Sequence, residues 1–186
     1  ANRDFIKKIT MSKFVQEIED RAFSDCHSLS VVTFGDNSQL KKMGEEVFSD
    51  CEDLKKIVIP KNIRKIETGT FYGCKKLSDV TFESGSNLQS IGEDVFGDCK
   101  SLKKIVIPKS VQKIEDSAFM YCKKLSDVTF ESGGGLQKIG EEAFSDCINL
   151  KKIVIPKNVK IIAGGAFYNC KNMVSVTFQS GSKLQK

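Results

Sequence analysis

The stretch Ser101–Cys122, SLKKIVIPKSVQKIEDSAFMYC, contains an octet, LKKIVIPK, that occurs three times in the chain, beginning at Leu54, Leu102 and Leu150. A second phrase, LSDVTFES, begins at Leu77 and again at Leu125, so the two phrases alternate. Repeats with periods of about 20 to 50 residues are typical of solenoids, in which each unit buries its apolar side against its neighbours. The alternation therefore predicts a stack of coils of two kinds.

Cysteine and phenylalanine give the register of this repeat. Successive cysteines are separated alternately by 25 and 23 residues, and a phenylalanine lies three positions before each of them. The cysteines are Cys26, Cys51, Cys74, Cys99, Cys122, Cys147 and Cys170, and by their spacing the coils begin at Ile6, Leu29, Leu54, Leu77, Leu102, Leu125, Leu150 and Met173. We predict a single solenoid domain over residues 1–186, and we expect it to be a fragment of a longer repeat array.

Each coil is predicted to contain one short β-strand. Leu54, Ile57 and Ile59 are spaced so that alternate side chains of a strand enter the core. Pro60 ends the strand in the 23-residue coils, whereas a Gly/Ser/Asn cluster such as ESGSN ends it in the 25-residue coils, and both are turn chemistry. The chain then returns through a short strand or a helical turn, and the two extra residues of the longer coil should bulge from one edge. Neighbouring strands lie about 4.8 Å apart, so about eight of them would span roughly 34 Å.

Composition limits the classes of partner. The chain has 40% hydrophobic residues, which supports a folded protein, and a formal net charge of +5. Its only arginines are Arg3, Arg21 and Arg64, and a shortage of guanidinium groups disfavours recognition of phosphates and bases. No apolar run approaches the ~18 residues that span a bilayer, and no hydrophobic leader opens the chain. We therefore expect no nucleic-acid partner and no membrane insertion.

The strand segments resemble the leucine-rich repeat superfamily, whose strand reads L-x-x-L-x-L-x-x-N. Residues 29–37 and 54–62 match this pattern, with Asn37 and Asn62 at its last position. More narrowly, IGEEAFSDCINLKKIVIPKNV, residues 139–159, resembles the BspA-like class, in which an Ile-Gly-x-x-Ala-Phe-x-x-Cys return precedes a strand ending in Ile-Pro. Other coils depart from the pattern: Ser110, Gly85 and Gly133 replace the asparagine, and Met11-Ser12 replaces Ile-Pro. The asparagine ladder should therefore be incomplete.

This resemblance implies a fold and a function. The fold would be a mainly β solenoid, a right-handed leucine-rich-repeat superhelix of about eight coils of alternating 23 and 25 residues, with a parallel sheet on its concave side. Members of the family are commonly surface proteins of bacteria and protists that adhere to host proteins or to other cells. The implied function is a non-enzymatic protein-binding and adhesion module, extracellular or on the cell surface.

The outward residues of the predicted strands are the candidate binding surface. The third strand position alternates lysine with aspartate, which avoids the repulsion between like charges on adjacent strands, and the fifth position carries a β-branched residue. We predict that these residues bind a protein partner: Lys56, Val58, Asp79, Thr81, Lys104, Val106, Asp127, Thr129, Lys152 and Val154. The alternative is that this face only stabilises the solenoid. Tyr72, Tyr121 and Tyr168 could form a second patch, or could serve packing.

The cysteines and the single histidine are not expected to carry chemistry. One cysteine per coil stacks the side chains in a column that suits disulfides poorly, and the absence of Cys-x-x-Cys pairs disfavours zinc, so we predict reduced core cysteines. His27 follows Cys26, but Cys26 is an ordinary repeat position, so we predict no catalytic residue. SGGGL, residues 132–136, lacks the Gly-Lys-Ser/Thr ending of a phosphate loop and is interpreted as a turn. We predict no cofactor.

An acidic column lies three positions before the phenylalanines. A calcium site needs convergent oxygen ligands, yet Thr68 and Gly164 interrupt the column and no calcium-loop spacing occurs. We interpret the column as a solvated face, with cation binding as the alternative, and predict no metal site. Its members are Asp20, Glu45, Glu93, Asp116 and Glu141.

Two further hypotheses stay open from the sequence. The chain could be a structural spacer or stalk, or a consensus-like engineered scaffold, in either case without a ligand of its own. Solenoid ends without polar caps expose core and strand edges, so we also expect self-association through them.

Overall fold

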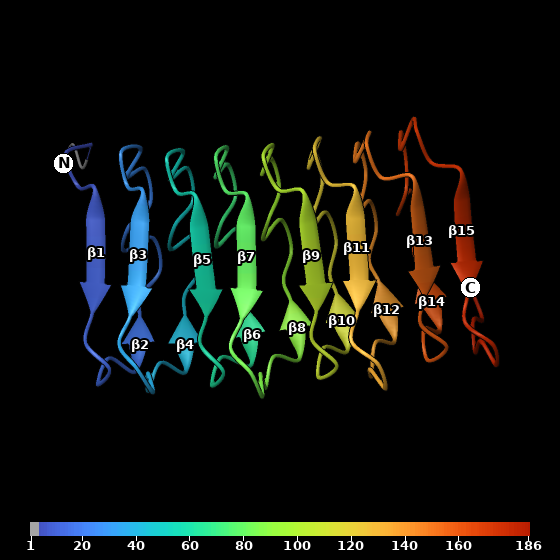
Figure 1. Cartoon of the computed structure of the whole chain (residues 1–186), viewed down its shortest axis with the longest axis horizontal. Helices are drawn as coiled ribbons and strands as arrows, with labels where there is room; N and C mark the ends of the chain where they lie inside the picture. The colour runs from blue at the N-terminus through green and yellow to red at the C-terminus, as the bar shows by residue number, and fades with distance from the viewer. Residues whose placement is uncertain (1–3) are drawn as a thin grey trace.

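The computed structural model describes residues 4–186; the first three residues of the predicted domain lie outside that range. It is a solenoid of parallel strands, in which each coil places a four-residue strand in one row and most coils add a two-residue strand in a second row (Figure 1). Residues 4–186 include no helix that could cross a membrane. The long strands are β1 (Lys8–Met11), β3 (Val31–Phe34), β5 (Lys56–Ile59), β7 (Asp79–Phe82), β9 (Lys104–Ile107), β11 (Asp127–Phe130), β13 (Lys152–Ile155) and β15 (Ser175–Phe178). The short strands are β2 (Glu17–Ile18), β4 (Lys42–Met43), β6 (Lys65–Ile66), β8 (Ser90–Ile91), β10 (Lys113–Ile114), β12 (Lys138–Ile139) and β14 (Ile161–Ile162).

The long strands are hydrogen-bonded only in pairs. β1 pairs with β3, β5 with β7, β9 with β11 and β13 with β15, whereas β6, β8, β10, β12 and β14 form one five-stranded sheet. The hydrogen-bonded ladder of the long strands is therefore interrupted after every 25-residue coil. We attribute the interruption to the longer coil itself: it has two extra residues after the strand, and its strand ends in a half-buried phenylalanine, such as Phe82, where the shorter coil has a buried isoleucine, such as Ile107.

Of the two structures that the sequence left open for the return segment, residues 4–186 contain the short strand and no helical turn. A two-residue strand is followed by a run of turns that contains the core phenylalanine. The residues two positions before and after each phenylalanine have positive φ; around Phe96 these are Asp94 at 54° and Asp98 at 58°. This alternation directs the N–H of Phe96 along the solenoid axis, where it donates to the carbonyl of Ala118 in the next coil at 2.8 Å. The turns thus form their own ladder between coils.

Phenylalanine and cysteine make the centre of the core. The rings from Phe23 to Phe167 stack with centroids 5.1 to 5.7 Å apart. Each cysteine thiol after the first donates to the phenylalanine carbonyl of the preceding coil, as Cys99 Sγ does to Phe71 O at 3.3 Å. All seven cysteines are reduced and buried, as predicted. The regular spacing of phenylalanine and cysteine in the sequence therefore produces one continuous apolar column. A thiol–carbonyl hydrogen bond connects each coil to the next along this column.

The asparagine position has two structural roles. In the shorter coils Asn62 Nδ2 donates to the carbonyl of Ser38 at 2.9 Å, and Asn158 makes the same bond to Gly134, but Ser110 Oγ is buried without a hydrogen-bond partner. In the longer coils the equivalent residue has a positive φ: Asn37, Gly85, Gly133 and Gly181. The glycines there meet a backbone requirement of the turn. The ladder is incomplete, as predicted, and Ser110 is the position where a bond is lacking.

Candidate protein-binding face

The third and fifth residues of each coil, which are the first and third residues of its long strand, point outward and form what we call the long-strand face. The ten residues that the sequence nominated are all exposed on it. Val58, Val106 and Val154 are each about half-exposed, at 48%, 51% and 50%, although they are apolar. The long strands that carry the nominated residues lie in one row along the solenoid axis (Figure 1).

The predicted alternation of charge is present in the register of the strands. Lys56 lies opposite Asp79, and Lys104 lies opposite Asp127. Within residues 4–186, however, no ion pair joins either couple; the ion pairs lie on other surfaces. The alternation thus keeps lysines from facing one another and leaves both charges available to solvent or to a partner.

A cleft opens where β7 and β9 are not hydrogen-bonded to each other. Its volume is about 420 Å³, and both strands line it over most of their length. Asp79 and Thr81 lie on one side and Lys104 and Val106 on the other, with the inward residues between them. The lining is Asp79, Val80, Thr81, Phe82, Lys104, Ile105, Val106, Pro108 and Glu131. The site thus combines charged sides with an apolar lining, a composition that can hold a protein side chain.

The cleft continues toward the turns that follow the strands. A second hollow of about 370 Å³ shares Phe82, Pro108 and Glu131 with it. Glu131 Oε2 accepts the N–H of Lys109 at 2.9 Å, and Glu83 and Gln179 make the equivalent bonds to Lys61 and Lys157. These bonds fix the residue after each proline, so the end of the groove is built from repeated contacts.

The three tyrosines lie in the turn segments. Tyr72 and Tyr121 are partly exposed and Tyr168 is 66% exposed. The ring of Tyr72 lies against Gly97, where a Cβ would come within 2.9 Å of its Cδ2. Burial raises the pKa of Tyr72, and the nearby Asp98 and Asp94 raise it further. Tyr72 therefore has a packing role, while Tyr168 presents most of its ring to solvent.

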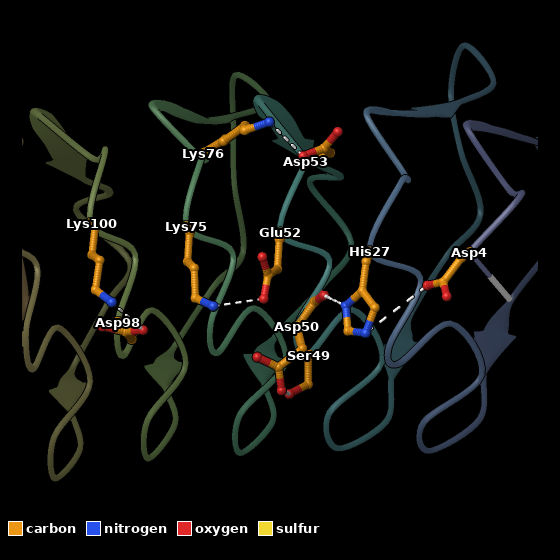
Figure 2. Close-up of polar contacts among 10 residues, drawn as sticks. All are labelled: Asp4, His27, Ser49, Asp50, Glu52, Asp53, Lys75, Lys76, Asp98 and Lys100. Carbon is orange, nitrogen blue, oxygen red and sulfur yellow. Dashed lines mark hydrogen bonds and ion pairs between the residues drawn. The ribbon is translucent and has the colours of Figure 1, made fainter. Parts of the chain in front are cut away.

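His27 and Cys26 do not form a catalytic pair. Cys26 is fully buried. The Nδ1–H of His27 donates to the carbonyl of Asp50 at 3.0 Å, and its Nε2 lies 4.0 Å from Asp4 Oδ1 (Figure 2). The bond to Asp50 is the main reason that the pKa of His27 is raised, with a smaller contribution from Asp4. A substrate would not reach the Cys26 thiol.

The acidic column has a local structural role at two of its members. Asp20 Oδ1 accepts the N–H of Glu45, and Asp116 Oδ1 accepts the N–H of Glu141, each at 2.9 Å. The intervening Gly140 permits this contact, because a Cβ there would lie 2.5 Å from Asp116 Oδ1. Within the described range 4–186, no group of three or more His, Cys, Asp or Glu residues is arranged to hold a metal ion.

The cleft itself was not predicted. Val80, Phe82, Ile105, Pro108 and Glu131 line it, and none of them was nominated from the sequence. The signal was present in the alternation of 23 and 25 residues, since the unpaired junction follows each longer coil. Spacing alone does not indicate how far two strands separate, so the sequence could not predict the cleft.

Comparison with known proteins agrees with this architecture. The family model described as "BspA type Leucine rich repeat region (6 copies)" matches residues 1–126 and 81–186. A leucine-rich repeat protein from Bacteroides ovatus is 33% identical with a TM-score of 0.72, and the match covers 83% of this chain and 38% of that one. The T. pallidum leucine-rich repeat protein is 29% identical with a TM-score of 0.80, covering 91% of this chain and 79% of that one. No curated protein sequence matches.

A third structure, the pneumococcal vaccine antigen PcpA, shares the fold. Its identity is 21% and its TM-score 0.64, with 94% of this chain and 62% of that one covered. The chain thus spans a little over a third of the B. ovatus protein and about four-fifths of the T. pallidum protein. Because the family model covers all 186 residues, the chain belongs to the BspA-type leucine-rich repeat family.

Proposed function

We propose that this chain is a non-enzymatic module that binds a protein partner on its long-strand face. The observation that carries the proposal is the cleft between β7 and β9, with Lys104 and Asp79 on opposite sides and half-exposed Val106 beside them. Alternating fixed charges favour a partner of complementary pattern, and the apolar groups add area that such a partner can bury.

We further propose that the module acts at a cell surface in adhesion. The support is analogy with the family, since bacterial leucine-rich repeat proteins are the structures that it resembles. We also propose that copies of the 186-residue chain bind one another through the ends of the solenoid. This proposal rests on β1 and β15, each of which, within residues 4–186, has a neighbouring long strand on one side only.

A spacer without a ligand of its own is the second candidate function. The unbroken stack of phenylalanine rings favours it, because a continuous core can support a long, self-sufficient scaffold. A spacer and a binding module differ in one respect: only the module depends on the identity of the side chains on the long-strand face.

Photocrosslinking from the cleft distinguishes the two functions. A photoreactive amino acid is placed at Val106, or at exposed Lys113 on β10 as the control, and each protein is irradiated with a mixture of serum and extracellular-matrix proteins. The captured protein is then purified, and its affinity is measured for Lys104→Glu, Asp127→Lys and the control Lys113→Glu. We expect capture from Val106 and roughly tenfold weaker binding for each face reversal.

The control reversal should change affinity by less than about twofold, as a charge outside an interface does. Equal capture from both positions, or affinities that are unchanged by both face reversals, would contradict the proposal and favour the spacer.

A further inference from the structure

A row of lysines lies where the chain passes from each cysteine to the following long strand. These residues, which we call the basic edge, precede β9, β11, β13 and β15 and are all exposed: Lys103, Lys123, Lys124, Lys151 and Lys171. The N-terminal ends of the long strands lie along one edge of the solenoid (Figure 1). This edge is distinct from the outward side chains of the long-strand face.

The first copy of a repeated phrase shows how such lysines are neutralised. CKKLSDVTFES occurs at residues 74–84 and again at 122–132. In the first copy Lys75 Nζ lies 2.6 Å from Glu52 Oε1, and Lys76 Nζ lies 2.7 Å from Asp53 Oδ1 (Figure 2). The preceding coil provides both carboxylates because Glu52 and Asp53 follow Cys51. Both lysines of this copy therefore have a partner within the protein.

The second copy has no such partners. The preceding coil has Lys100 and Ser101 after its cysteine, and Lys100 itself pairs with Asp98 at 3.2 Å. The following coil has Ile148 and Asn149 at the same positions. Within the described chain neither Lys123 nor Lys124 forms an ion pair. In the first copy of the phrase the two lysines are paired with carboxylates, whereas in the second copy Lys123 and Lys124 keep an uncompensated positive charge.

The uncompensated lysines lie in four consecutive coils: Lys123 and Lys171 share one coil position, and Lys103 and Lys151 share another. Successive coils are separated by about the distance between stacked rings, 5.1 to 5.7 Å. Beside these lysines, the long-strand face alternates Lys104, Asp127 and Lys152, so positive charge does not extend across a plane. A linear polyanion can contact several coils at once, whereas a flat anionic membrane would also meet the aspartates.

We propose that the basic edge binds a linear sulfated polysaccharide. Sulfate groups on successive sugars place fixed charges along one dimension, as the lysines are placed. Lysine is a compact, strongly hydrated charge that attracts such groups without the bidentate geometry of arginine. The attraction between exposed charges is screened by salt, so binding should weaken as ionic strength rises.

The two copies of the repeated phrase provide a matched test. Binding to immobilised heparin is measured at several salt concentrations for Lys123→Gln/Lys124→Gln and for Lys75→Gln/Lys76→Gln, which alter identical local sequences. We expect roughly fivefold or greater loss of affinity at low salt for the first variant, with a shallower salt dependence, and less than about twofold loss for the second. Lys151→Gln/Lys171→Gln, from two other coils, should resemble the first variant.

Urea unfolding midpoints equal to that of the parent protein establish that the variants are folded. Equal losses for the two matched variants would overturn the proposal, as would equal binding to heparin and to chemically desulfated heparin. Binding to phosphatidylserine vesicles without binding to heparin would assign the edge to membranes and would also overturn it. Because the basic edge and the long-strand face are altered by different substitutions, failure of one proposal leaves the other standing.

Discussion

At the scale of single residues, the repeat is defined by small polar contacts as well as by apolar ones. Asn62 and Asn158 each tie a turn to the preceding coil, and the cysteine thiols tie each coil to a phenylalanine carbonyl. A buried polar group without a partner costs free energy, so the one exception in the series is informative. Ser110 Oγ is such a group. It lies at the position that asparagine occupies in the other two coils whose strand ends in Ile-Pro.

Substitution Ser110→Asn should stabilise the protein. The amide can donate to the carbonyl of Ser86, which occupies the position of Ser38 and Gly134 in the neighbouring coil pairs. We expect the free energy of unfolding to rise by about 1 kcal/mol, measured by urea denaturation at an unchanged m-value. The reverse substitution Asn62→Ser should lower it by a similar amount. A shift in the same direction for both substitutions would show that the bond is not responsible.

At the scale of elements, the sequence predicted the strands and their core residues because the alternation of apolar residues has a direct geometric meaning. It also nominated ten outward residues of the long-strand face, all of which are exposed. It could not predict the positive φ values around each phenylalanine, because Arg21, Glu46, Ser117 and Tyr121 occupy positions at which glycine would be expected. Gly69 and Gly73 were the only complete pair of glycines to mark them.

Three glycine substitutions separate the effects of backbone and of space. Gly73 has φ +69°, and a Cβ there would lie 2.2 Å from Asp50 Oδ1; Gly85 has φ +75° with nothing within 4 Å; Gly164 also has open space and no positive φ. We expect Gly73→Ala to destabilise most, Gly85→Ala by about 1 kcal/mol, and Gly164→Ala by less than about 0.5 kcal/mol. Urea unfolding of the three variants tests this order, which a destabilised Gly164→Ala would contradict.

At the scale of the whole molecule, the buried thiols link stability to alkaline pH. Burial raises the pKa of Cys51 to about 12 and that of Cys170 to about 11, and raises the pKa values of Cys74, Cys99, Cys122 and Cys147 as well. Unfolded thiols ionise near pH 8.5, whereas the folded ones stay protonated. Stability should therefore be complete below about pH 8.5 and should fall as pH rises toward the folded pKa values, by up to about 1.4 kcal/mol per pH unit for each thiol.

Urea unfolding under reducing conditions at several pH values between about 7.5 and 10 measures this fall. Substitution Cys99→Ser, which retains a donor for the Phe71 carbonyl but does not titrate in this range, should reduce the slope by the share of one thiol. A free energy of unfolding that is constant from pH 8 to about 10 would contradict the protonated state of the core thiols.

The pairwise hydrogen bonding of the long strands also has a mechanical consequence. On the return side, the short strands β6, β8, β10, β12 and β14 form one continuous hydrogen-bonded sheet. The long strands on the opposite side are hydrogen-bonded only in pairs. From β6 onward such a rod is stiff on the return side and jointed on the other, so we expect it to bend in steps of one coil pair by closing or widening the junctions after β7 and β11. The curvature of the long-strand face could then adjust to a rigid partner at each junction, and successive junctions are separated by one 48-residue coil pair.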